Sequence, residues 1–182
     1  MKALVGSLFL AGAGVALCWS ASCSPPSDAR IGIDAPVETL FPPVSDLLAY
    51  RCGSLDCHGS PQRNFVIWSC YGLRLDEDAA PGCRQQGGSN TTAGEYLATY
   101  DSLVALEPAV MSQVVASGGA DPDLLTFVRK ARGEEEHKGG KLWDPGSVDD
   151  DCVASWLESV SDGGTAATCE LGLAEDLEAG TR

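Results

Sequence analysis

Eight cysteines constrain this chain of 182 residues more than any other feature, and what they form depends on the compartment that the chain occupies. In an oxidising compartment cysteines pair as disulfides, whereas in the cytosol they point to metal binding or catalysis. The hydrophobic content of 44% is ordinary for a globular protein. The start of the chain therefore decides how the cysteines are interpreted.

The first 22 residues have the layout of a secretory signal. Lys2 supplies a positive charge, residues 4–17 form an apolar run, and Ser20-Ala21-Ser22 supplies small residues before a cleavage point. The apolar run is too short for a stable membrane span. We expect residues 1–22 to be removed on export.

Cys23 directly follows the small residues. The segment Ser20-Ala21-Ser22-Cys23 resembles the lipobox of bacterial lipoproteins, in which the cysteine becomes lipid-modified. This resemblance implies lipidation of Cys23 and a place in the bacterial cell envelope, either facing the periplasm or on the outer membrane. Membrane contact would then be by the lipid anchor only, and each buried CH₂ of that anchor contributes about 0.8 kcal/mol. The alternative is plain secretion with Cys23 as an unmodified thiol.

The net charge of the chain argues against two classes of partner. There are 26 acidic and 12 basic residues, which gives a formal net charge of −14. Binding to nucleic acid needs clustered Lys and Arg, and so does electrostatic docking on anionic lipid. We therefore expect neither kind of partner.

The organisation of the chain is that of one small, mostly α-helical domain with long loops. We interpret residues 23–43 as a lipidated cysteine and proline-rich tether, 44–169 as the domain and 170–182 as an acidic tail, with a frayed helix as the alternative for the tail. Helical spacing is found from residue 44 to Cys52, over 95–117 as one or two helices, after Asp121, and over 149–160. Residues 64–75 predict either a strand or an irregular apolar stretch that packs on the core.

Four of the cysteines are expected to be structural. Cys70 and Cys83 enclose a loop that contains Pro-Gly, and Cys152 and Cys169 enclose the end of the last expected helix and a glycine turn. Closing each loop is worth about 3 kcal/mol in the chain-entropy model. This pairing rests on proximity, since four cysteines allow three connectivities.

Cys52 and Cys57 differ from the other cysteines because His58 follows at once. Two thiols followed by histidine are typical of covalent haem c attachment, in which the thiols add to two vinyl groups and the imidazole ligates the iron. Here the spacer is four residues, where two is usual. One alternative is a tight Cys52–Cys57 disulfide beside an ordinary surface histidine. A zinc site is another, although export disfavours thiolate zinc.

The second axial ligand of such a haem would come from elsewhere in the chain. After residue 22 the chain holds one other histidine, His137, and one methionine, Met111. His137 lies in a polar glycine-rich loop ahead of the helix over 149–160, which makes it the better candidate. Met111 lies among valines in a helix, where methionine is more often a core residue. The alternative for His137 is an exposed loop histidine among acids.

Three motifs in order carry a resemblance to a family. Cys-Gly-Ser-Leu-Asp-Cys-His-Gly at 52–59, His-Lys-Gly-Gly at 137–140 and Asp-Asp-Cys-Val-Ala-Ser-Trp-Leu at 150–157 look like a cytochrome-c-like domain of exported bacterial lipoproteins. They are most similar to the planctomycete-type cytochrome c domains, over residues 41–162. The resemblance implies that Cys52 and Cys57 attach haem, that His58 is the proximal ligand and that Trp156 is the packing aromatic of the last helix.

The sequence thus favours a haem-binding electron-transfer lipoprotein that is not an enzyme. His58 and His137 are its candidate iron ligands. The acidic surface favours an unidentified redox partner with a basic docking surface. The alternative function is a cofactor-free, disulfide-stabilised surface or interaction lipoprotein with a degenerate cytochrome fold.

Overall fold

The structure is a computed structural model that describes residues 32–79, 82–83, 88–159 and 163–179. The predicted signal, Cys23 and residues 24–31 of the predicted tether lie outside the described residues. The described part of the chain contains six α-helices, two short 3₁₀ helices and no strand. The prediction of a mostly α-helical, disulfide-stapled chain is therefore confirmed. None of the described helices combines the length and the apolar character needed to cross a bilayer.

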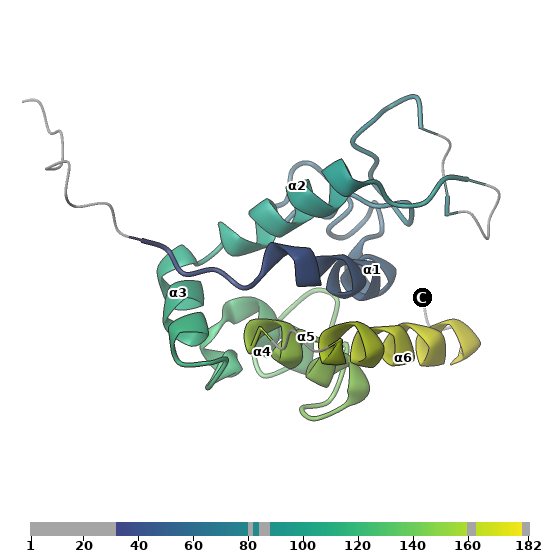
Figure 1. The fold of residues 1–182 in the computed structure, drawn as a ribbon. Helices are drawn as coiled ribbons and strands as arrows, with labels where there is room; N and C mark the ends of the chain where they lie inside the picture. Colours follow the sequence, from purple (N-terminus) through teal and green to yellow (C-terminus); the bar gives the residue numbers. More distant parts are fainter. Residues whose placement is uncertain (1–31, 80–81, 84–87, 160–162, 180–182) are drawn as a thin grey trace, which may run out of the picture. The chain divides into compact units, whose positions relative to one another are not determined.

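The helices follow one another with loops of very different length (Figure 1). Their bounds are η1 Glu38–Leu40, α1 Phe41–Cys52, α2 Ala93–Val104, α3 Pro108–Ala116, η3 Pro122–Leu124, α4 Thr126–Arg132, α5 Val148–Leu157 and α6 Gly164–Ala179. Helix α1 packs against α2, α5 and α6, and α5 packs against α6. The long stretch between α1 and α2 and the loop between α4 and α5 carry the residues of the candidate site.

Helix α1 begins earlier than the tether prediction allowed. It starts at Phe41, with Pro42 and Pro43 inside its first turn. Proline is tolerated there because the first N–H groups of a helix have no intrahelical acceptor. Ser45 is buried inside the helix, close to its N-terminal end. The helix ends at Cys52, as expected.

The other helix boundaries follow local signals. The side chain of Thr92 accepts a hydrogen bond from the Glu95 N–H and that of Glu95 accepts from the Thr92 N–H, so a capping box starts α2. Ser147 caps α5, and three aspartates in its first turn complement the helix dipole. Residues 170–179, expected to be a tail, form the C-terminal part of α6, which packs on α1 and α5.

Residues 64–75 form an irregular apolar stretch and not a strand. Only one isolated bridge, between Trp68 and Leu73, is present in it. Ile67 is fully buried and Phe65 is nearly so. The backbone N–H groups of Val66 and Trp68 donate to the hydroxyls of Ser102 and Thr99 on α2, so side chains replace a neighbouring strand.

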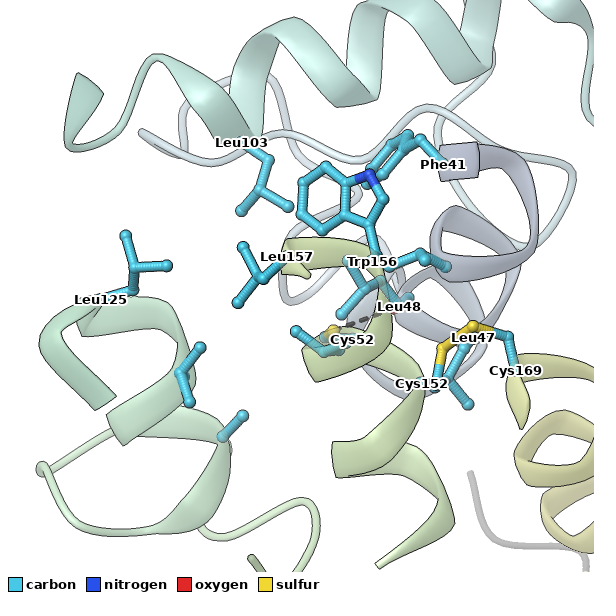
Figure 2. Close-up of a cluster of buried hydrophobic side chains, with 14 of the residues drawn as sticks. Phe41, Leu47, Leu48, Cys52, Leu103, Leu125, Cys152, Trp156, Leu157 and Cys169 are labelled. Carbon is cyan, nitrogen blue, oxygen red and sulfur yellow. Dashed lines mark hydrogen bonds between the residues drawn. A yellow bond between two sulfur atoms is a disulfide. The ribbon is translucent and has the colours of Figure 1, made fainter. Parts of the chain in front are cut away.

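The core is centred on Trp156 of α5. Figure 2 shows its indole ring surrounded by Phe41, Leu103 and Leu157. The ring centroids of Phe41 and Trp156 are 4.9 Å apart, and the indole N–H donates to the carbonyl of Val37 at 3.2 Å. Trp156 is thus a buried packing aromatic, but its helix α5 is not the last one as expected, because α6 follows it.

The two expected disulfides are present. Cys70 is bonded to Cys83, and Cys152 is bonded to Cys169. The second bond joins α5 to α6 at the edge of the core, as Figure 2 shows. Arg51 of α1 adds ion pairs to Asp149 of α5 and Asp176 of α6.

Candidate functional site

A cavity of about 550 Å³ opens beside the core, and Cys52, His58 and His137 from the sequence analysis all line it. This volume is in the range of sites that hold small molecules and cofactors, about 300–1,000 Å³. Apolar side chains form much of its wall, and two histidines and one cysteine share it. The lining residues are Leu48, Cys52, His58, Gln62, Arg63, Asn64, Phe65, Leu106, Glu107, Thr126, Phe127, Lys130, Ala131, His137, Leu142 and Trp143.

The four-residue spacer between the two thiols folds into a compact turn. The N–H groups of Cys57 and Gly59 both donate to the carbonyl of Ser54, at 2.9 Å. The His58 N–H donates to the carbonyl of Cys52 at 3.0 Å. The longer spacer therefore loops out, and His58 returns to the end of α1 where Cys52 lies.

Gly53, Gly59 and Gly72 allow the backbone of this turn to pack closely on neighbouring backbone. A Cβ on Gly59 or on Gly72 would collide with the carbonyl oxygen of Gly53. The backbone of residues 53–59 thus packs directly on its own start and on the segment at Gly72. A turn packed in this way keeps the backbone of His58 in one position.

One of the two ring nitrogens of His58 makes a hydrogen bond within the domain. Its Nδ1 lies 2.9 Å from the carbonyl oxygen of Phe65, and a carbonyl can only accept, so Nδ1 carries the hydrogen. Nε2 is then left with its lone pair, which is the arrangement that second-shell contacts give to metal-binding histidines. Burial lowers the pKa of His58, and His137, Arg63 and Lys130 nearby also lower it. The ring is therefore neutral at neutral pH.

His137 lies beside His58 although 79 positions separate them in the sequence. The two ring centroids are 5.9 Å apart and the ring planes are inclined by 30°. Metal–imidazole bonds are about 2 Å long, so this separation is short enough for one ion to reach a nitrogen of each ring. Nδ1 of His137 is buried and has no hydrogen-bond partner in the described part of the chain.

Cys52 and Cys57 are both unpaired, unlike the four other described cysteines. Cys52 is buried, lines the cavity and donates its S–H to the carbonyl of Leu48 at 2.9 Å (dashed line in Figure 2). Burial raises the pKa of Cys52 to about 12, with a further rise from Cys57, so Cys52 is a thiol. Cys57 is half-buried and does not line the cavity.

Two alternatives from the sequence find no counterpart in the described residues. Nowhere among them do three or more Cys, His, Asp or Glu gather as ligands for a metal ion. Met111 is 1% exposed and belongs to the hydrophobic core. It does not line the cavity, in agreement with its expected place in the core.

The aromatic and cationic side chains of the cavity were not singled out in the sequence. Phe127, Lys130 and Ala131 are spaced three and four apart on α4, which places them on one helix face. That spacing is visible in the sequence, but it does not tell which face meets the histidines. Trp143 is held by its indole N–H, which donates to Asp150 at 3.1 Å.

Comparisons with protein families, with curated proteins and with solved structures give no match for this chain.

Proposed function

We propose that this domain binds one haem covalently and acts in electron transfer. The observation that carries the proposal is the meeting of His58 and His137 in one cavity that an unpaired cysteine also lines. A bound haem would supply an iron that changes between two oxidation states. The proposal requires no catalytic residue and no substrate.

The residues present fit such a group in their chemistry. His58 offers Nε2, because Nδ1 is held by the carbonyl of Phe65. His137 offers a second imidazole, and its buried Nδ1 has no hydrogen-bond partner among the described residues. Leu48, Phe127 and Leu142 are among the apolar residues of the wall, which would exclude water from a flat apolar macrocycle.

The two cysteines would supply the covalent links. Addition of a thiol to a vinyl group forms one carbon–sulfur bond and moves the thiol hydrogen to the neighbouring carbon, so no oxidant is needed. Cys52 already lines the cavity as a thiol. Cys57 lies one residue from His58 and is free to react.

We extend the proposal to the place of the protein in the cell. Export, lipidation of Cys23 and a bacterial envelope location rest on the sequence alone, because residues 1–31 lie outside the described part of the chain. The net charge of −14 favours a redox partner with a basic docking surface.

The proposal is tested by spectra of the full chain, exported from a bacterium that attaches haem to c-type cytochromes. We expect a low-spin spectrum in the wild type and loss of the low-spin form in His58→Ala. His137→Ala should give high-spin or water-ligated iron. Met111→Leu is the control and should leave the spectrum unchanged, since Met111 is a core residue.

Two outcomes would contradict the proposal. An exported protein without haem, with Cys52 and Cys57 joined by a disulfide, would support the cofactor-free scaffold. A spectrum that changes in Met111→Leu but not in His137→Ala would remove His137 from the site.

A further inference from the structure

The lining of the cavity combines buried apolar residues with exposed polar ones. Its wall includes Leu48, Phe65 and Trp143, which are all buried. Its other lining residues include three consecutive exposed polar residues, Gln62, Arg63 and Asn64, and the partly exposed Lys130. A ligand that matches this combination has an apolar body and a polar edge that reaches solvent.

The charges in the lining of the cavity run against those of the whole chain. Acidic residues outnumber basic ones by 26 to 12, yet Arg63 and Lys130 both line the cavity. Glu107 is the one carboxylate among the lining residues, and its oxygens already accept hydrogen bonds from another residue. Its oxygens accept from the N–H of Thr126 at 2.7 Å and from the hydroxyl of Thr126 at 2.8 Å.

Hydrogen bonds hold the guanidinium group of Arg63 in position, but they do not neutralise its positive charge. Its Nε donates to the carbonyl of Cys57 at 3.1 Å, and its Nη2 donates to the carbonyl of Asp56 at 3.0 Å. Carbonyl oxygens fix the guanidinium in place but leave its full positive charge. Arg63 makes no ion pair with a carboxylate in the described part of the chain.

Lys130 has one carboxylate neighbour, but their pair is weak. Its Nζ lies 3.4 Å from Glu135, and both side chains are more than one third exposed. Exposed pairs of this kind contribute little, because water and salt screen them. Glu135 also accepts from Arg129, so Lys130 can turn to a ligand while Glu135 keeps a partner.

We propose that Arg63 and Lys130 bind carboxylate groups at the edge of the ligand in this cavity. The inference rests on the proposed function, and for haem the carboxylates are its two propionates. The pair then makes the site select an apolar macrocycle with an acidic edge over a neutral one. The two cations also fix which edge of the macrocycle faces solvent.

The test compares two probes that differ only at the carboxylates. The full chain, prepared without haem, is titrated with haemin and with haemin dimethyl ester, and binding is followed by absorbance. We expect the wild type to bind the diester about tenfold more weakly, since a partly exposed charge-assisted hydrogen bond is worth about 1.4 kcal/mol. Lys130→Gln and Arg63→Gln should each weaken haemin binding while leaving diester binding unchanged.

The controls separate this inference from the proposed function. Lys141→Gln removes a cation that does not line the cavity and should change neither affinity. Arg63→Lys keeps the charge and should retain most of the preference for haemin. Lys130→Gln stays informative if Arg63→Gln disturbs the turn at Cys57. Equal binding of both probes by the wild type would overturn the inference alone, and binding of neither would overturn the proposed function with it.

Discussion

Gly139 gives the ring of His137 the space that it occupies. A Cβ added at Gly139 would lie 2.9 Å from Cε1 and 3.2 Å from Nδ1 of that ring. The neighbouring Gly140 has a positive φ of 69°, and a Cβ there would meet nothing within 4 Å. Gly139 therefore leaves room for the His137 ring, whereas Gly140 matters only for the conformation of the backbone.

We expect Gly139→Ala to displace the His137 ring without unfolding the domain, because the colliding atoms belong to a movable side chain. In the haem-loaded protein the low-spin spectrum should weaken toward that of His137→Ala. Gly140→Ala should keep the spectrum and lose about 1 kcal/mol of stability from backbone strain. An unchanged spectrum in Gly139→Ala would show that the ring does not need its present position.

The two unpaired thiols should differ in reactivity in the haem-free protein. The thiolate is the nucleophile, and the pKa of the buried Cys52 is raised to about 12, whereas Cys57 is half-buried. At pH 8 iodoacetamide should therefore modify Cys57 well before Cys52, as measured by peptide mass. Equal rates at both positions would contradict the burial of Cys52 against Leu48.

At the scale of elements, a carboxyl between two helices makes stability depend on pH. Asp46 of α1 accepts from the hydroxyl of Tyr96 on α2, with both carboxylate oxygens 3.0 Å away. Burial raises the pKa of Asp46 to about 6, although the hydrogen bond from Tyr96 opposes the shift. The folded state thus binds this proton more tightly than the unfolded chain, whose aspartates have a pKa of about 3.9.

The contribution of Asp46 to stability should fall as pH rises from about 4 to about 6, because the folded state must give up a proton that it holds more tightly. Asp46→Asn keeps an oxygen acceptor for Tyr96 and removes the titration. We expect this variant to be more stable than the wild type at pH 7 by about 3 kcal/mol, and the difference to vanish near pH 4. Urea unfolding at several pH values measures it, with the exposed Asp144→Asn as control. A difference independent of pH would contradict the shift.

Much of the helical organisation could be predicted from periodicity and end signals. Pro108 separates α2 from α3, and Gly133 ends α4 with a positive φ of 73°. The start of α1 was missed because proline breaks a helix in its interior but suits its first turn. The extent of α6 was missed because its stability comes from packing on α1 and α5, which no local pattern reveals.

The candidate site could be predicted only in part. The order Cys52, Cys57, His58 is a local pattern, and the structure places it on one turn at the end of α1. His137 was a candidate from its loop, but its position 5.9 Å from His58 depends on tertiary packing. Arg63 and Lys130 come from different segments, so no spacing rule connects them.

The acidic surface of the molecule and the cations that line its cavity act over different distances. The net charge of −14 acts at a distance and favours encounter with basic partners. Arg63 and Lys130 act within contact distance of whatever fills the cavity. If carboxylates neutralise these two cations, the bound protein presents its partners with an acidic surface even around the site.

If Cys52 and Cys57 attach a haem covalently, as we propose, the haem cannot be washed out of the protein. The most direct measurement is the visible spectrum of the purified, exported full chain after extraction with acidified acetone, which removes haem held by iron ligands alone. We expect the haem absorbance to stay with the precipitated polypeptide. Absorbance that leaves with the solvent, or a chain that carries none before extraction, would contradict it.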